Sequence, residues 1–454
     1  MRNGTFFKDR HEFGRLVLYK IILVLVLTIF PACLFGQITA RGLGMGGAYT
    51  ALARGAHAPT WNPANLGLPD NPHFSMTFLS VGVGVWNNAF TKSMYDQYFV
   101  NGEKDEDGNI IWDQDDIEDI LNHIPDDGLH MHSDVSVRTF TFSTGQWAVS
   151  LGADAGSLVR MDKALLRLPL EGNTQNETYH LRDTRAIGLG VGMLGFSWGQ
   201  PVTVSFADVF SVGGTVRILY GGVYGETEKA EGSFITREYG FDVDADYELA
   251  YSFEGKVGFG LDVGAAAQFG ERWTVSLGLA NVLGTVPWSS LDKEVGYVRG
   301  DTLAVLDISK DDDEDDVIDD STWTLEDLPG FSSRMPVVIR LGVAYREGPI
   351  LLTADYTQGF TDGAFTSTTP MVSVGTEGRW IPWLPLRMGV VIGGRMGLGT
   401  SIGFGIRPGG FVMDFGVMTR GLIVPGNSKG YIFGLELGME LNKPDSGVLR
   451  VKDF

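Results

Sequence analysis

The feature that most constrains the fold is a period-two alternation of apolar residues with small or polar ones, which recurs between residues 184 and 441. In the segment 431–441 (YIFGLELGMEL), every odd position is apolar, and four of the five even positions carry glycine or glutamate. The segments 257–264 (VGFGLDVG) and 337–346 (VVIRLGVAYR) alternate in the same way. Successive side chains of a strand point to opposite faces, so the alternation predicts half-buried β-strands.

Three further features favour a membrane barrel over a soluble β-sandwich, which also alternates. The segments are about ten residues long, which is the length that a tilted strand needs to cross a bilayer. The turns at 269–272 and 346–349 are short, and the polar face is rich in glycine, of which the chain has 62. A closed barrel also leaves no unpaired strand edge in lipid. We therefore predict an all-β, transmembrane antiparallel β-barrel.

The number of strands follows from counting the segments. Fifteen segments qualify, whereas single-chain bacterial barrels normally have an even number of strands. We predict 14 strands, within a range of 12 to 16. The count of fifteen would then include a false strand within 209–253 or lack a strand at 447–454. The segments are 73–85, 134–144, 146–157, 184–197, 209–221, 240–253, 256–269, 271–283, 336–346, 349–358, 370–380, 384–394, 398–408, 410–421 and 430–441.

The N-terminus has the pattern of a secretory signal peptide. Five basic residues precede the apolar run 21–30 (IILVLVLTIF), and small residues surround a cleavage point after residue 36. Export of a barrel predicts the bacterial outer membrane as its location. An uncleaved anchor and lipidation at Cys33, the single cysteine, are the alternatives. The predicted organisation is a signal peptide (1–36), an N-terminal plug (37–71) and a barrel (72–454).

The segment after the leader carries the most specific motif. Residues 44–53 (GMGGAYTALA) and 61–66 (WNPANL) resemble the N-terminal signature of FadL-like outer-membrane barrels, a superfamily of fatty acid and hydrocarbon transporters that includes PorV-like secretion proteins. Asn65 stands where the family more often has glycine, and Arg54 and Gly55 stand where acidic residues are commoner. The region 72–160 also resembles an uncharacterised barrel family within this group, which implies no function.

The resemblance implies that the segment before the first strand folds inward as a plug. Glycine would let the plug backbone approach the barrel wall closely, and the Asn-Pro pair would fix a turn. A short periplasmic extension without a gating role is the alternative. The candidate plug and gating residues are Gly44, Gly46, Gly47, Tyr49, Trp61, Asn62 and Pro63.

Two acidic insertions, 92–134 and 287–335, interrupt the barrel and suit its extracellular side. The first should contain a short helix at 115–123, and its three histidines or its GEKDEDGNI stretch are weak candidates for a metal or calcium site. The second carries DDDEDDVIDD at 311–320, which we expect to be a solvated, mobile loop. Divalent cations at Asp311, Asp313 and Asp315 are a weak alternative; we predict no other cofactor.

The remaining polar residues suggest no catalytic chemistry. Neither a Gly-x-Ser-x-Gly elbow nor a serine–histidine pairing is evident, so we do not expect an enzyme. Charges facing a narrow lumen need partners, and mutual ion pairing explains them. The predicted lumen-facing charged residues are Asp262, Arg340, Asp355, Glu377, Arg379, Arg407, Asp414, Arg420, Glu436 and Glu440.

Charge and architecture together limit the function. A net charge of −21 argues against nucleic acid as a partner. Trp273, Trp380 and Trp383 near strand ends suit an aromatic girdle among outer-membrane lipids. We predict passive uptake of small hydrophobic molecules through a plugged lumen. The alternatives are a PorV-like barrel that binds a secreted or secretion-system protein, and a purely structural surface barrel.

Overall fold

The computed structural model describes residues 38–441, apart from 106–107, 109, 172–174, 183, 238–239, 305–318 and 425. The predicted signal peptide (1–36), the segment 447–454 and the candidate cation residues Asp311, Asp313 and Asp315 lie outside the described residues. None of the described helices is long and apolar enough to cross a membrane.

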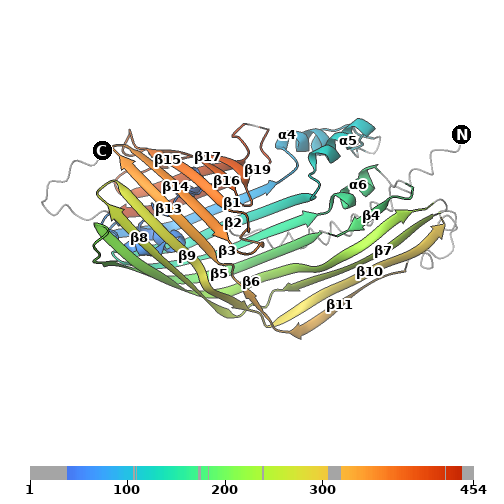
Figure 1. The fold of residues 1–454 in the computed structure, drawn as a ribbon, viewed down its shortest axis with the longest axis horizontal. Coiled ribbons are helices and arrows are strands. Elements are labelled where there is room, and N and C mark those ends of the chain that lie inside the picture. The colour runs from blue at the N-terminus through green and yellow to red at the C-terminus, as the bar shows by residue number, and fades with distance from the viewer. Residues whose placement is uncertain are drawn as a thin grey trace.

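The described part of the chain forms a closed antiparallel barrel of 14 strands (Figure 1). Each strand pairs with the next around the barrel, and β1 closes it by pairing with β19 from Phe74↔Leu441 to Trp86↔Gly430. The predicted architecture and strand number are confirmed. The barrel strands are β1 (Phe74–Asn87), β2 (Leu129–Thr144), β3 (Trp147–Met161), β5 (Arg185–Val202), β6 (Val209–Thr236), β8 (Val257–Phe269), β9 (Trp273–Pro287), β13 (Val338–Glu347), β14 (Ile350–Gly359), β15 (Met371–Gly378), β16 (Leu386–Gly393), β17 (Gly397–Ile406), β18 (Phe411–Arg420) and β19 (Gly430–Leu441).

The fifteenth predicted segment, 240–253, is a strand but not a barrel strand. It corresponds to β7 (Gly240–Ser252), which pairs with the distal half of β6 instead of the barrel wall. The proximal half of β6 pairs with β8, so the barrel closes without β7. The segment that is not a barrel strand therefore lies within 209–253, which is one of the two sources of error predicted for the strand count.

The two ends of the barrel differ in the length of their connections. At one end the hairpins are tight, and Gly270 (φ 59°) and Gly348 (φ 55°) supply the left-handed turn positions that other residues rarely adopt. The first and last barrel strands, β1 and β19, also begin and end there, because Phe74 pairs with Leu441. The long insertions lie at the opposite end. Short turns are periplasmic and long loops extracellular in outer-membrane barrels.

The outer surface of the barrel is apolar. Outward side chains such as Phe259 (63% exposed) and Ile392 (62% exposed) would be costly in water but suit lipid. At the short-turn end, Trp273, Trp380 and Trp383 are exposed, and the Trp273 ring lies 4.6 Å from that of Tyr345. An apolar band with aromatic residues at its border is the surface of an outer-membrane barrel.

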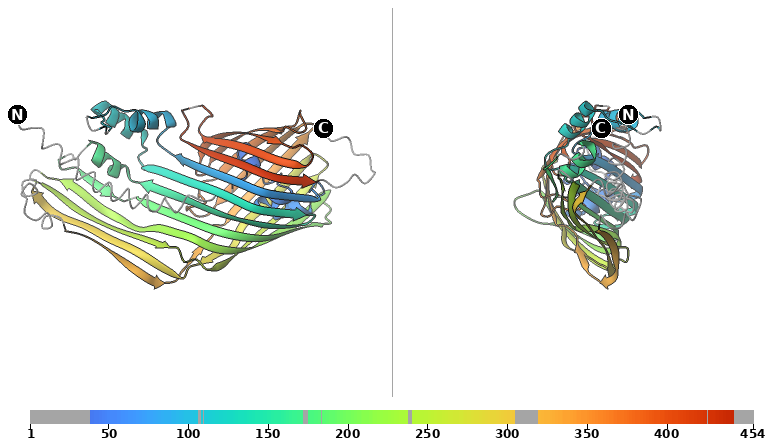
Figure 2. Two further views of the ribbon diagram at one scale, coloured as in Figure 1. Left: turned by 180° about the vertical axis from the view of Figure 1, so that it is seen from behind. Right: turned by 90° about the vertical axis from the view of Figure 1, so that its right-hand side faces the viewer.

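A sheet continues from β6 past the long-loop end of the barrel (Figure 2). We call this sheet the arm; it consists of the distal half of β6 (224–236) with β4 (Thr178–Leu181), β7, β10 (Ser290–Ala304) and β11 (Asp319–Pro329). The prediction of a long acidic loop over 287–335 is therefore wrong for β10, β11 and the short β12 (Ser332–Arg334). Consecutive charged residues, such as 292–294 and 319–320, hide the strand pattern there, and ion pairs across the sheet such as Lys293–Glu228 stabilise it.

Short helices cover the other long loops. These are α4 (Lys92–Tyr95), η3 (Asp96–Val100), α5 (Gln114–His123) and α6 (Lys163–Glu171). The predicted helix at 115–123 is confirmed as α5, whose N-terminus is capped by the Asp113 carboxylate accepting from Asp116 N at 2.8 Å. Tyr98, Ile120 and Leu121 pack beneath it in a small core of their own.

Candidate functional site

Residues 38–71, which we call the inner segment, lie inside the barrel (Figure 2). They form four short helices, α2 (Ala40–Gly44), η1 (Gly55–His57), α3 (Ala58–Trp61) and η2 (Pro63–Gly67). Side chains cap these turns, because the Thr39 hydroxyl accepts from Gly42 N at 3.3 Å and the Asn62 amide oxygen accepts from Ala64 N at 3.0 Å. Gly46 (φ 70°) and Gly47 (φ 84°) turn the chain after α2.

Glycines on the inner face of the wall form two belts against which the inner segment packs. The first belt crosses neighbouring strands β15 to β19, and the second crosses β5, β6, β8 and β9. A Cβ on Gly375 would lie 2.5 Å from Met45 O, and one on Gly213 would lie 2.5 Å from Ala64 N. The belts explain why the polar face of the alternating strands is so rich in glycine. Their members are Gly375, Gly389, Gly403, Gly416 and Gly434, and Gly199, Gly213, Gly264 and Gly278.

Polar side chains of the wall hold the backbone of the inner segment. One carboxylate oxygen of Asp355 accepts from the backbone N–H groups of Tyr49 (2.9 Å) and Thr50 (2.8 Å). The Ser401 hydroxyl accepts from Gly46 N at 2.8 Å. In the opposite direction, the Asn62 amide donates to the carbonyl oxygen of Ala265 on β8 at 2.9 Å. Buried backbone groups of the inner segment that lie outside regular hydrogen bonding of its short helices thus form hydrogen bonds with the barrel wall.

A buried charge cluster joins α2 to the wall near the short-turn end. The Glu377 carboxylate on β15 accepts from Arg41 (3.1 and 3.2 Å), from Arg379 (2.7 Å) and from Arg387 (2.7 Å). Arg387 also forms an ion pair with Asp414 at 2.6 Å. Three guanidinium groups around one carboxylate make Glu377 the centre of the cluster, and Arg41 is the member that belongs to the inner segment.

The cluster extends along β18 and β19 through Asp414. Its second carboxylate oxygen accepts from Arg407 at 3.0 Å, and Arg407 lies 3.5 Å from Glu440. Charges of both signs therefore alternate through the cluster, so most members have a counter-charge within reach.

A second polar contact joins η1 to β19. The imidazole of His57 pairs with the Glu436 carboxylate through Nε2, and its Nδ1 lies 2.7 Å from the Tyr49 hydroxyl. Burial alone would lower the pKa of His57, but the Glu436 carboxylate and the Tyr49 oxygen outweigh burial and raise this pKa to about 10. His57 is therefore a cation at neutral pH and forms a charged contact between the inner segment and the wall.

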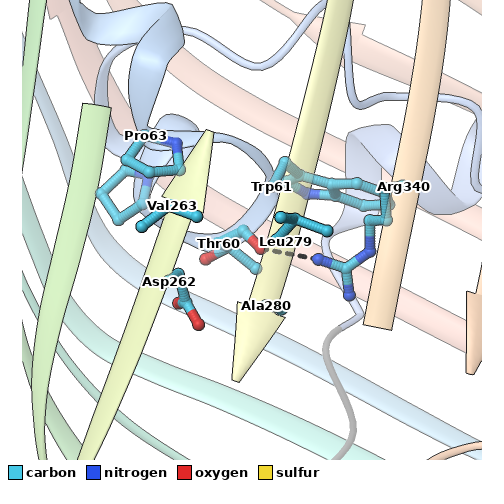
Figure 3. Close-up of a pocket in the computed structure, with 9 residues that line it drawn as sticks. Thr60, Trp61, Pro63, Asp262, Val263, Leu279, Ala280 and Arg340 are labelled. Carbon is cyan, nitrogen blue, oxygen red and sulfur yellow. Dashed lines mark hydrogen bonds between the residues drawn. The ribbon is translucent and has the colours of Figure 1, made fainter. Parts of the chain in front are cut away.

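A small cavity lies between the inner segment and the wall beside Arg340. Figure 3 shows Arg340 of β13 beside Trp61. The guanidinium carbon of Arg340 lies 5.5 Å from the centre of the Trp61 ring. Arg340 also donates a hydrogen bond to Thr60 O at 3.3 Å. This cavity of about 10 Å³ lies beside them, bordered by Asp262 and Leu279. One water molecule needs roughly 10–15 Å³ by this measure, so the cavity is no open channel.

The structure places the other predicted lumen residues in separate contacts. Asp262 pairs with Arg217 and accepts from Asn281 N at 2.7 Å. Arg420 donates to the carbonyl oxygen of Arg395 at 3.1 Å, near the long-loop end. The predicted plug residues Gly44, Gly46, Gly47, Tyr49, Trp61, Asn62 and Pro63 all belong to the inner segment.

Sequence reasoning missed several functional candidates inside the barrel. Arg217 and Arg387 lie on the inward faces of their strands. Arg217 follows the inward-facing Thr215 by two positions, so the period-two pattern could have identified it. Arg41 and His57 lie in a segment without a period, so no such signal marks them. The three clustered histidines are not brought together, because His132 stacks on Trp86 whereas His123 is exposed on α5. Among the residues with described positions, no three His, Cys, Asp or Glu side chains could hold a metal ion.

An apolar patch on the inner wall was not predicted. Along β6, Gly213 touches the inner segment, whereas Leu219 and Gly221 on the same face lie closer to the long-loop end. Trp288 contacts Gly221 and stacks on Phe331 with ring centres 6.0 Å apart. We call the cluster the upper patch; its buried members are Leu189, Val191, Met193, Leu219, Val286, Trp288, Met335 and Ala364.

Comparison with known proteins gives a family match and a set of similar folds. Residues 63–254 match a family described as "Family of unknown function (DUF5723)". No curated protein matches the chain. Among solved structures, it is similar to the Ralstonia pickettii toluene transporter TbuX (14% identity, TM-score 0.47), over 91% of this chain and 100% of the other.

Two further structures are similar at the same level. The P. putida toluene transporter TodX shows 11% identity and a TM-score of 0.47, over 91% of this chain and 100% of the other. A Pseudomonas aeruginosa FadL homologue shows 13% identity and a TM-score of 0.48, over 89% and 98%. The N-terminal segment was predicted to resemble FadL-like barrels, and the similar structures include a FadL homologue. The strand pairing, not this similarity, establishes the barrel.

Proposed function

We propose that the chain is a conduit for the passive uptake of small hydrophobic molecules across the outer membrane, and not an enzyme. The upper patch carries this proposal. The interior of an outer-membrane barrel is ordinarily polar. The partly exposed residues that pack on this cluster, Tyr224, Phe331 and Phe365, offer an apolar solute the surface that binds it, above the buried Leu219 and Trp288.

The inner segment is the proposed plug on this route. It lies in the lumen on the short-turn side of the upper patch, where the cavity beside Trp61 and Arg340 holds about one water molecule. A solute that reaches the patch can go further only when the inner segment shifts from the wall. The contacts of Arg41, His57 and Asn62 with the wall oppose this shift, so they set how often the route opens.

Uptake of N-phenyl-1-naphthylamine, a dye that fluoresces in apolar surroundings, tests the proposal in cells that express the protein in their outer membrane. We expect faster dye uptake with the wild type than with an empty vector. Leu219→Asn and Phe331→Ser should each slow uptake, because they make the patch polar. Val216→Thr is the matched control, because Val216 points to lipid on the same strand (55% exposed) and should leave uptake unchanged.

Folding of each variant is checked by its heat-modifiable migration in gels, so that loss of uptake is not mistaken for loss of the barrel. Uptake by the wild type that equals the empty vector would contradict the proposal. So would Leu219→Asn and Phe331→Ser variants that fold and take up the dye like the wild type. A barrel that binds a protein partner is the second candidate, and the arm, which the uptake route does not use, favours it.

A further inference from the structure

The arm extends far beyond what a membrane barrel requires. β6 has 28 residues, whereas about 9–11 residues cross a bilayer. Its distal part, 224–236, pairs with β7 along its whole length and spans about 40 Å at about 3.3 Å per residue. Figure 2 shows this sheet projecting past the long-loop end. A structure of this size outside the membrane has a surface large enough for a partner.

The last strand of the arm has an open edge. β11 pairs with β10 along one side, from Ser290↔Pro329 to Arg299↔Asp319, and within the described residues its other side pairs with no strand. Most of its side chains are exposed. The unpaired N–H and C=O groups of such an edge can pair with another extended chain.

One face of this edge carries an apolar strip, which we define as Val295 and Tyr297 on β10 with Trp323 and Leu325 on β11. Val295 is paired with Trp323, and the rings of Tyr297 and Trp323 lie 6.1 Å apart. Trp323 is 42% exposed and Leu325 41% exposed. Edge strands that only need protection carry charges or proline at such positions, so exposed tryptophan and leucine indicate a contact surface.

The negative charge of the arm favours a partner with positive charge. The sequence of its strands, 224–236, 240–252, 290–304 and 319–329, holds 14 acidic residues and 3 basic ones. The basic residues Lys229, Lys293 and Arg299 are already paired with carboxylates of the arm. A second copy would place the same acidic strand opposite β11, and like charges across a strand pair are destabilising. A cationic chain would instead find counter-charges at both ends of β11.

We infer that the arm docks an extended, basic polypeptide segment, which adds as a strand to the free edge of β11. The backbone groups of β11 provide the hydrogen bonds, and the apolar strip receives alternate apolar side chains of the partner. The carboxylates at Asp320 and Glu326, on the opposite face of β11, receive its basic side chains. This site is separate from the lumen and does not depend on the proposed uptake.

The test uses the full chain in detergent and fluorescence anisotropy with labelled eight-residue peptides. One peptide alternates lysine with valine, a second alternates glutamate with valine, and a third is the lysine peptide with N-methyl groups along the edge that faces β11. We expect only the first to bind, because the second repels the arm and the third cannot donate backbone hydrogen bonds. The double variant Trp323→Ser/Leu325→Ser should weaken binding about tenfold or more, the change that about 1.4 kcal/mol produces.

Phe253→Ser is the matched control, since Phe253 is 58% exposed but lies beyond the end of β7 and outside the arm. It should bind the lysine peptide like the wild type. If the N-methylated peptide bound as tightly as the lysine peptide, strand addition would be overturned. The binding would then be adsorption of a cationic peptide to an acidic surface. Absence of binding by the lysine peptide, or unchanged binding by the double variant, would overturn the docking site itself.

Discussion

At the scale of single residues, buried charges fix the position of the inner segment. Glu377 and Arg387 are fully buried, and the Arg41 side chain is only 10% exposed. Burying a charge is costly, and removing one partner leaves the other without compensation. Arg41 therefore has one favourable location in the barrel, beside Glu377, and this requirement specifies how α2 docks.

Glu377→Gln tests this requirement. The change leaves three arginines around a neutral amide, so we expect the free energy of unfolding to fall by about 3–5 kcal/mol, the usual cost of breaking a buried ion pair. Urea unfolding in detergent, followed by gel migration, measures it. Glu347→Gln is the control, because the Arg272–Glu347 pair is more than half exposed and should cost less than about 1 kcal/mol. Equal losses in the two variants would contradict the role of Glu377.

The contact between His57 and Glu436 predicts a dependence on pH. The pKa of His57 is raised from 6.5 to about 10, so its stabilising contribution is complete below pH 6.5 and is lost as the pH rises to about 10. The difference in unfolding free energy between the wild type and His57→Gln should therefore shrink steadily between pH 6.5 and pH 10. Urea titrations across this range measure it. A difference that stays constant over the range would show that His57 contributes no charge to the contact.

Residue positions in the lumen were predictable only where the chain has a period. Alternation placed Asp355, Asp414 and Glu436 on the polar face of their strands, and all three are buried in the structure. Arg41 and His57, which pair with Glu377 and Glu436, lie in short helices of the inner segment whose contacts are set by tertiary packing. A single sequence contains no local signal for such pairings.

At the scale of elements, the glycine belts match the shape of the wall to that of the inner segment. The belt glycines lie within strands and several pair with each other, as Gly375 does with Gly389 and Gly199 with Gly213, so glycine is needed for close approach and not for a turn. This gives the high glycine content a physical cause. Every alternating strand was found from sequence, including β7, but β10 and β11 of the arm were missed because runs of charged residues such as 292–294 interrupt the alternation.

Gly389→Ala tests the fit between the belts and the inner segment. The added methyl group would overlap the backbone of Met45 and Gly46, so the inner segment must move. We expect trypsin to cut after Arg54 about tenfold faster or more, because a loss of about 1.4 kcal/mol in local stability raises the open population by that factor. Mass spectrometry of the digest measures the cut. Gly192→Ala is the control, since its methyl group would have no neighbour closer than 3.8 Å. Equal cleavage of both variants would contradict the close fit.

At the scale of the whole molecule, the barrel and the inner segment form one packed unit. The outer and inner surfaces of the barrel wall require residues of opposite kinds. Lipid requires the apolar band outside, whereas the inner segment requires glycine and paired charges inside. The period-two pattern satisfies both at once, which is why the barrel was predictable from sequence. The period-two pattern says nothing about what lies in the lumen, because physical chemistry alone allows many fillings.

Deleting residues 39–68 should convert the filled barrel into an ion-conducting pore. A 14-stranded barrel is wide enough to hold a water-filled lumen when nothing packs inside it. The wall should survive the deletion, because Glu377 keeps Arg379 and Arg387, and Asp414 keeps Arg387 and Arg407. In planar lipid bilayers we expect stepwise conductance from the deletion variant and none from the wild type. Gly192→Ala, which keeps the inner segment in place, should stay closed. A closed deletion variant that is still a folded barrel would show that the extracellular loops, and not the inner segment, seal the lumen.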